Sequence, residues 1–318
     1  MVDPMSLVLV EAKMRVQRFV VFLTALPLAL GSGPRTATRV IRFLDEDGIE
    51  CHGAPSADGS LEGTMAELIE GDALGERRLT GEVRRVAKLL SPIKDPPAIY
   101  GIGLNYAKHA HQANLSIPLS PIVFFKNRNS LTGPTDTVVV PSVSTLPDYE
   151  VELAVVTRKT CKDVSYEDAL DCVLGYTVAN DVSARCWQDS KNGNKTHQTC
   201  LGNSGQWSFS KSFDTHCPLG PALVTKDELG DGSGLDLTMH LNGELMQSDS
   251  SSDMIFDVRK IIEFITIGTT VEAGTVILTG TPGGVGITRT PAVVLQDGDN
   301  MTCSISKIGS ISNIVSRK

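Results

Sequence analysis

From Ala98 to the C-terminus, the chain is a succession of short runs rich in Val, Ile, Thr and aromatic residues. Gly, Pro, Asn and Asp separate these runs, which is typical of β-strands joined by turns. Only SYEDALDCVLG (165–175) and SSDMIFDVRKIIEFIT (251–266) show a helical pattern. We therefore expect a mainly β, mixed α+β domain over residues 96–318.

Weaker patterns precede this domain. TRVIRFLDEDGIECHG (38–53) alternates and turns at Asp47-Gly48, which predicts a β-hairpin. MAELIEGD (65–72) and LTGEVRRVAKLLSPI (79–93) have the pattern of short helix-like and apolar pieces, and Pro96-Pro97 follows them. These features predict a small N-terminal subdomain over residues 36–95.

Residues 1–35 are expected to be an N-terminal extension. The stretch MRVQRFVVFLTALPLALGSG (14–33) contains two arginines, then an apolar run over residues 19–30, then small residues. This is the outline of a targeting segment, and the run is too short to span a bilayer comfortably. The alternative is an appended tail or helix outside the main fold. We expect a cytoplasmic protein without a membrane span, with a mitochondrial or signal-directed location as the alternative.

Charge and cysteine content limit the possible partners and compartments. The formal net charge is −8, and no Lys/Arg cluster is interleaved with aromatic residues, which argues against nucleic acid as the main partner. The seven cysteines are widely spaced, odd in number and free of any CxxC pair. This pattern favours reduced thiols over a disulfide framework or a zinc site.

Three acids stand at the ends of strand-like runs. LPDYEVELAVV (146–156) places Glu150 and Glu152 two residues apart, so both carboxylates should lie on one side of a strand. Asp181 directly follows another such run, GYTVAN (175–180). Three hard oxygen ligands suit Mg²⁺ or Mn²⁺ better than zinc. The alternative is an exposed sheet face that carries acids without a metal.

Six motifs occur in order along the chain: GIGLNYAKHA (101–110), PDYEVELAVV (147–156), GYTVANDVSAR (175–185), GQWSFSKSFDTHCPLGP (205–221), LNGELMQSDSSSDMIF (241–256) and VILTGTPGGVG (276–286). Together these motifs resemble the fumarylacetoacetate hydrolase family, particularly its shorter acylpyruvase and oxaloacetate-handling members. The resemblance implies a β-sandwich roll, a homodimer, and Mg²⁺ or Mn²⁺ held by Glu150, Glu152 and Asp181. It also implies a small 2-oxo or 1,3-diketo acid as substrate.

The resemblance further implies roles around the metal. Lys211, in SKSF, matches the family's active-site lysine, which would stabilise negative charge that develops on the substrate. Arg185 and Gln188 match positions that orient the substrate, and their spacing puts them on one helical face. Thr281, in LTGTPGG, matches the residue that holds a substrate carboxylate. Without the resemblance, Lys211 would be read as a solvated lysine and Arg185 as an ion-pair partner of the acidic strand.

His109 matches the family's lid histidine, which takes a proton from the attacking water. Family hydrolases usually have a glutamate three residues later, whereas this chain has Gln112. A glutamine can orient the imidazole by a hydrogen bond but cannot stabilise its charged form. His109 is therefore either the base that activates water or a lid residue that closes over the substrate.

Three functions remain open. The first is a metal-dependent hydrolase that cleaves a C–C bond in an acylpyruvate-like 1,3-diketo acid. The second is an oxaloacetate decarboxylase or keto–enol tautomerase, which needs the metal but no activated water. Gln112 favours the second and His109 favours the first, which we place slightly ahead. The third is a non-catalytic metal-binding homologue, against which the complete set of acids, Arg185 and Lys211 argues.

Overall fold

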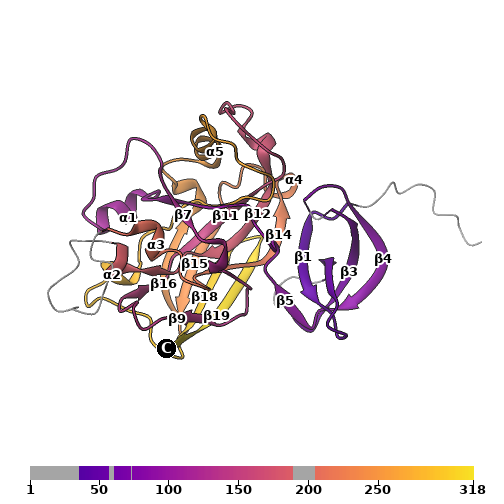
Figure 1. Cartoon of the computed structure of the whole chain (residues 1–318), viewed down its shortest axis with the longest axis horizontal. Helices are drawn as coiled ribbons and strands as arrows, with labels where there is room; N and C mark the ends of the chain where they lie inside the picture. The colour runs from indigo at the N-terminus through magenta and orange to yellow at the C-terminus, as the bar shows by residue number, and fades with distance from the viewer. Residues whose placement is uncertain (1–35, 57–60, 73, 189–204) are drawn as a thin grey trace, which may run out of the picture. The chain divides into compact units, whose positions relative to one another are not determined.

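The computed structural model describes residues 36–56, 61–72, 74–188 and 205–318 (Figure 1). The predicted N-terminal extension lies outside these ranges, as does the polar, Gly/Asn-rich stretch of residues 189–204, for which the sequence predicts a surface loop. The described residues belong to one compact unit. The subdomain boundary expected near residue 95 stays a prediction. Within the described ranges, no helix is both long and apolar enough to cross a membrane.

A large, mostly antiparallel sheet runs through the molecule, with a parallel pairing between β17 and β6. The short strands β5 (Lys88–Leu90) and β8 (Leu131–Thr132) pair with β1 and β14. Along the sheet the order is β4 (Arg77–Arg85), β3 (Met65–Gly71), β2 (Glu50–Pro55), β1 (Arg39–Leu44), β14 (Cys217–Thr225), β12 (Val173–Asn180), β11 (Val151–Thr157), β17 (Val276–Leu278), β6 (Ile99–Gly103) and β7 (Ile122–Lys126).

A second sheet packs against the centre of the first. Its strands are, in order, β16 (Glu244–Ser250), β15 (Asp236–Leu241), β18 (Asn300–Ile305), β19 (Gly309–Arg317) and β9 (Val138–Val140). A short ladder joins β10 (Pro147–Asp148) to β13 (Ser183–Ala184). The mainly β, sandwich-like fold expected from the sequence is confirmed.

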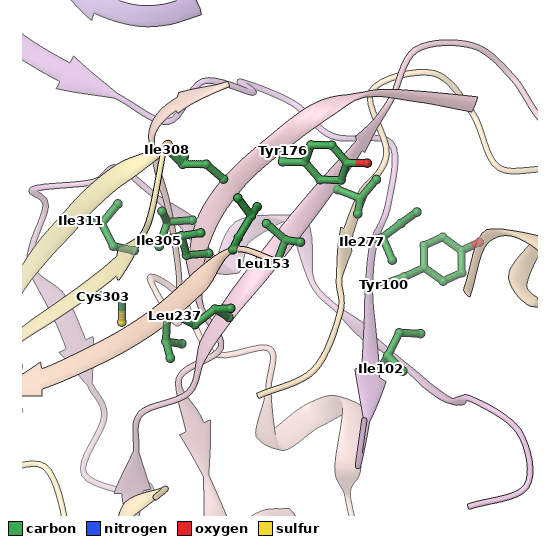
Figure 2. Close-up of a cluster of buried hydrophobic side chains, with 14 of the residues drawn as sticks. Tyr100, Ile102, Leu153, Tyr176, Leu237, Ile277, Cys303, Ile305, Ile308 and Ile311 are labelled. Carbon is green, nitrogen blue, oxygen red and sulfur yellow. The ribbon is translucent and has the colours of Figure 1, made fainter. Parts of the chain in front are cut away.

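The core explains why the central strands are apolar on both faces. Figure 2 shows Leu153 and Tyr176 of the first sheet facing Leu237, Cys303 and Ile305 of the second, in one buried cluster. Every residue of β11 and β12 is buried. The opposite face of the first sheet carries a second buried cluster, with Ala154, Val156, Ala179, Leu219 and Leu278 among its members.

Helices are short and lie at the ends of strands. The α-helices are α1 (Ala107–Gln112), α2 (Arg185–Gln188), α3 (Trp207–Ser210), α4 (Lys226–Leu229) and α5 (Val258–Thr266), and the 3₁₀ turns are η1 (Arg128–Ser130), η2 (Ala169–Cys172), η3 (Ser251–Asp253) and η4 (Gly286–Thr288). The helical pattern of residues 251–266 corresponds to η3 and α5, whose N-cap Asp257 accepts a hydrogen bond from the Lys260 amide. The pattern of residues 165–175 gives only η2, because the chain there must enter β12.

Of the two expectations for the secondary structure of residues 38–93, one is confirmed and one is wrong. The hairpin at Asp47-Gly48 is confirmed, since β1 and β2 pair antiparallel around it. Residues 65–72 and 79–93 are not helix-like: they supply β3, β4 and β5. Pairing of β2 with β3 and of β3 with β4 gives these half-polar segments backbone partners, and tertiary pairing of this kind overrides helix propensity.

The expectation of reduced thiols is wrong for Cys161 and Cys172, which form a disulfide. The connection between β11 and β12 turns back on itself, and the Arg158 amide donates to the Cys172 carbonyl oxygen at 2.8 Å. The two Cα atoms are therefore 6.3 Å apart, within the range that a disulfide spans. Cysteine spacing could not show this fold-back. Cys51, Cys217 and Cys303 are free thiols.

Candidate functional site

The register of β11 and β12 brings the three predicted metal ligands together. Val151 pairs with Asn180, so Glu150 precedes β11 where Asp181 follows β12. The Asp181 amide donates to the Glu150 carbonyl oxygen at 2.8 Å. Glu152 lies one strand position further along. One carboxylate oxygen from each of the three residues lies within 4.8 Å of the others, and all three side chains are buried.

Two lysines approach this acidic cluster. The Lys211 ammonium, at the C-terminal end of α3, lies 2.6 Å from Glu150 Oε2 and 2.6 Å from Asp181 Oδ2. Lys126, the last residue of β7, lies 2.5 Å from Asp181 Oδ1 and its side chain is fully buried. Sequence analysis missed Lys126, although its register with the buried Phe124 was a signal that it points inward.

The electrostatics of the cluster differ between its members. Burial would raise the pKa of Glu150, but the charges of Arg185 and Lys211 outweigh it and hold that pKa at about 2. Burial and then the carboxylates of Asp181 and Glu150 raise the pKa of Glu152 well above its ordinary value. The Glu152 carboxylate forms no ion pair with any described residue; Oε2 accepts a hydrogen bond from the Gly280 amide at 2.6 Å.

The donor set fits a divalent cation. Three converging carboxylates offer hard oxygen ligands, and Glu152 lacks a positive partner among the described residues. A cation between the three acids would remove the repulsion that raises the pKa of Glu152. The triad could therefore hold a divalent metal, and its members do not lie on a solvent-facing acidic surface.

Arg185 lies beside the triad at the start of α2. Its Nη2 is 2.6 Å from Glu150 Oε1, its Nε donates to Asp148 Oδ2 at 2.8 Å, and its Nη1 donates to the Gln188 Oε1 at 2.8 Å. The predicted helical face that carries Arg185 and Gln188 is thus present. Burial opposes the charge of Arg185, but the carboxylates of Glu150 and Asp148 raise its pKa.

Asp148 is a second residue that sequence analysis missed. Besides Arg185, its carboxylate accepts hydrogen bonds from the amides of Gly286 and Ile287 at 2.7 and 3.1 Å. A single buried acid therefore holds both Arg185 and the loop that follows β17. The available signal was its position two residues before Glu150, within the same motif.

Thr281 lies beside β11, because the chain after β17 continues along that strand. Its hydroxyl donates to the Val151 carbonyl oxygen at 2.9 Å and accepts from Gln247 Nε2 at 2.7 Å. In this arrangement the hydroxyl proton points at the backbone. A role in binding a substrate carboxylate stays a prediction, and it requires this hydroxyl to turn.

His109 and Gln112 both lie on α1, yet no hydrogen bond joins them. Gln112 Oε1 accepts from the Gly284 amide at 2.8 Å, and its amide group lies against Gly283. The His109 Nδ1 is buried and has no hydrogen-bond partner among the described residues. Burial lowers the pKa of His109, so its imidazole is neutral at pH 7.

One cavity of about 900 Å³ is lined by eight of the nine predicted site residues; Asp181 is not among its lining residues. Glu150, Glu152, Lys211 and Arg185 line its charged side. The cavity is also lined by His109, Gln112, Gln188, Thr281 and Arg289, and by the apolar residues Ile102, Leu104, Leu115, Ile122, Phe124, Trp207 and Ile287. A concave site with a few converging polar groups and shifted pKa values is typical of an enzyme active site.

Comparison with known proteins agrees with this geometry. Residues 98–316 match the family model Fumarylacetoacetate (FAA) hydrolase C-terminal. The chain is 41% identical over 266 residues to human "Oxaloacetate tautomerase FAHD2A, mitochondrial", covering 81% of each chain. It is 44% identical over 227 residues to the Xenopus laevis "Oxaloacetate tautomerase fahd2, mitochondrial", covering 71% of this chain and 68% of that one.

Solved structures give the same result. The 2-hydroxyhepta-2,4-diene-1,7-dioate isomerase from Mycobacterium marinum matches with a TM-score of 0.72 and 33% identity, covering 88% of this chain and 98% of that one. The 5-carboxymethyl-2-hydroxymuconate delta-isomerase from Mycobacterium smegmatis matches with a TM-score of 0.72 and 32% identity, covering 88% and 100%. Sequence motifs, fold and acidic triad therefore agree, and the chain belongs to the fumarylacetoacetate hydrolase family.

Proposed function

We propose that this enzyme is a metal-dependent keto–enol tautomerase of oxaloacetate-like 2-oxo dicarboxylic acids. The observation that carries the proposal is the arrangement of α1, in which Gln112 bonds to Gly284 and leaves His109 without an acidic partner. Activation of water by His109 would benefit from a carboxylate that stabilises the imidazolium. Tautomerisation needs no such water. The relatives named oxaloacetate tautomerase support the same choice.

The residues of the site suit proton transfer next to a 2-oxo group. A Mg²⁺ or Mn²⁺ ion held by Glu150, Glu152 and Asp181 would supply a Lewis acid that makes the neighbouring C3 protons more acidic. The neutral imidazole of His109 accepts a proton from C3. The Asp181 and Glu150 carboxylates, which outweigh burial, raise the pKa of Lys211 and keep it an ammonium, which stabilises negative charge on the 2-oxo oxygen.

The other site residues bind and orient the acid. Arg185 offers a buried guanidinium that Asp148 holds in place, and Gln188 extends the same polar surface. Thr281 lines the same cavity, and its hydroxyl would contact the substrate's first carboxylate after turning away from the Val151 carbonyl oxygen. Delivery of that proton to the 2-oxo oxygen gives the enol, and its return from oxygen to C3 gives the ketone, so only C–H and O–H bonds change and no carbon–carbon bond is broken.

Hydrolysis of an acylpyruvate-like acid remains a prediction, and His109 within the cavity is the observation that favours it. A spectrophotometric assay separates the two reactions. Freshly dissolved enol oxaloacetate should lose its enol absorbance faster with enzyme and Mg²⁺ than with enzyme and EDTA, and Glu150→Gln should remove the difference. Acetylpyruvate should stay intact. Metal-dependent release of acetate and pyruvate from acetylpyruvate, without faster ketonisation of oxaloacetate, would contradict the proposal.

We also propose a homodimer and a mitochondrial location. The latter rests on the names of the relatives and on residues 14–33, which contain two arginines and no acid, as transit peptides do. A reporter fused to residues 1–40 should enter mitochondria, and a cytoplasmic reporter would contradict the assignment. Sedimentation of residues 36–318 at twice the mass of one chain is the expected result for the dimer.

A further inference from the structure

Arg289 is a cation of the cavity that the roles described above do not use. It follows η4 and lines the same cavity as the acidic triad. Its Nε donates to the Gly284 carbonyl oxygen at 3.2 Å, and its Nη2 donates to the Met246 carbonyl oxygen at 2.7 Å. These two bonds hold one edge of the guanidinium against β16 and the loop after β17.

The charge of Arg289 is not balanced by a neighbouring acid. Its partners are carbonyl oxygens, and the nearby Tyr149 hydroxyl is also neutral. Among the described residues, no carboxylate forms an ion pair with it, and its remaining side-chain contact is a hydrogen bond with the neutral Tyr149 hydroxyl. The other two cationic side chains of the cavity differ in this respect, because Arg185 contacts Asp148 and Glu150, and Lys211 contacts Glu150 and Asp181.

The segment that carries Arg289 is firmly held. The Asp148 carboxylate binds the amides of Gly286 and Ile287, and the Arg289 amide donates to the Gly286 carbonyl oxygen at 3.2 Å. The same Asp148 holds Arg185 beside the triad. Arg289 is therefore fixed relative to the charged side of the cavity. A guanidinium positioned in this way can bind a carboxylate with little loss of conformational freedom.

We propose that Arg289 binds the distal carboxylate of the substrate and selects dicarboxylic over monocarboxylic 2-oxo acids. This assignment rests on the proposed function, in which the 2-oxo acid group at the other end of the substrate lies at the triad, Lys211 and Arg185. A substrate without the second carboxylate leaves the Arg289 charge unbalanced in the cavity. Arg289 is thus a specificity-determining residue and takes no part in the proton transfer.

Two non-reacting ligands test this assignment by binding alone. Malate and lactate share a 2-hydroxy acid group, and malate differs from lactate only by a second carboxylate in place of one methyl hydrogen. Each would be titrated calorimetrically into the Mg²⁺-loaded protein. The wild type should bind malate at least about tenfold more tightly than lactate, the typical value of one charge-assisted contact. Arg289→Gln should bring the two affinities within about twofold, through loss of malate binding alone.

Three further measurements exclude a merely structural effect. Arg128→Gln removes an exposed arginine that does not line the cavity, and it should keep the wild-type preference. Arg289→Lys, which keeps the charge but not the forked donor geometry, should give an intermediate ratio. If Arg289 only braces the loop after β17, Arg289→Gln should lower the melting temperature and weaken the binding of malate and lactate equally. That equal loss, or a wild type that binds malate no more tightly than lactate, would overturn the proposal.

Turnover then separates this inference from the proposed function. With oxaloacetate, Arg289→Gln should raise KM about tenfold or more and change kcat little, as expected for a binding contact. A wild type that prefers malate through Arg289 yet does not ketonise oxaloacetate would refute the tautomerase and leave the carboxylate site standing. Ketonisation with no malate preference would do the opposite.

Discussion

Replacing Glu152 with glutamine should have opposite effects on the metal-free and the metal-loaded protein. Burial and the carboxylates of Asp181 and Glu150 raise the pKa of Glu152 well above its ordinary value. The stability that the neutral Glu152 side chain contributes is therefore fully present below pH 4.5, its ordinary pKa. This contribution is lost as the pH rises through the higher pKa that Glu152 has in the folded protein. Glutamine has nearly the same shape, carries no charge and can still accept the hydrogen bond from Gly280.

The expected magnitude follows from the linkage between pKa and stability. One pKa unit corresponds to about 1.4 kcal/mol, so Glu152→Gln should raise the free energy of unfolding of the metal-free protein by at least about 1 kcal/mol at pH 7.5. For a chain of this size, that gain raises the melting temperature by roughly 2 °C or more. The difference should shrink as the pH falls toward 4.5, where both proteins carry a neutral side chain at this position.

Metal should reverse the order. A ligand present at a hundredfold excess over its Kd stabilises the folded state by about 2.7 kcal/mol. The wild type should gain this stabilisation from Mg²⁺ or Mn²⁺, whereas the variant, which has lost one of three charged ligands, should gain little. Differential scanning calorimetry in EDTA and in saturating metal measures both effects. Glu76→Gln, at an exposed glutamate outside the cavity, is the matched control and should change neither.

Two results would refute this reasoning. If Glu152→Gln lowers the melting temperature in EDTA, the three carboxylates do not repel each other as their burial implies. If metal stabilises the wild type and the variant equally, Glu152 is not a ligand. Either result would leave the fold intact but would remove the physical basis of the metal site.

Three other predictions concern the residues around the triad. Lys211→Met should lower kcat about 100-fold or more with a smaller change in KM, because the ammonium acts on charge that develops during the reaction; steady-state kinetics with oxaloacetate measures both constants. Asp148→Asn should cost about 3 to 5 kcal/mol in denaturant unfolding, since it removes one of the two acidic partners of the buried Arg185, and a cost below 1 kcal/mol would show that Glu150 alone suffices. Burial is the largest cause that lowers the pKa of His109, so its imidazole is the neutral base above pH 6.5. The value of kcat/KM should therefore fall only below pH 6.5 and stay flat from pH 6.5 to 8. A rate that still rises with pH above 7 would contradict the neutral imidazole.

The acidic triad could be predicted because strand periodicity and the order of motifs can both be read from short stretches of the sequence. Glu150 and Glu152 share a strand face, and Asp181 needs only the pairing of two neighbouring strands to reach them. Lys126 could not be assigned in the same way. It lies on the edge strand β7, which β11, β17 and β6 separate from the strand before Asp181, and the sequence does not show this long-range approach.

Two errors have a similar origin. Residues 65–93 have weak helical patterns, but long-range pairing decides their structure. The Cys161–Cys172 disulfide depends on how the connection between β11 and β12 turns, which residue spacing does not show. For Gln112, the sequence shows the departure from the family pattern but not the contact that the side chain makes. Its hydrogen bond with the Gly284 amide depends on where α1 lies against the loop after β17.

The central claim is that this site moves a proton at C3 and breaks no carbon–carbon bond. Proton NMR of oxaloacetate in D₂O, with purified residues 36–318 and either Mg²⁺ or EDTA, tests it most directly. We expect metal-dependent acceleration of C3 proton exchange with deuterium, with no product beyond the spontaneous background. Metal-dependent pyruvate would identify a decarboxylase, and oxalate with acetate would identify a hydrolase. Either result would contradict the account.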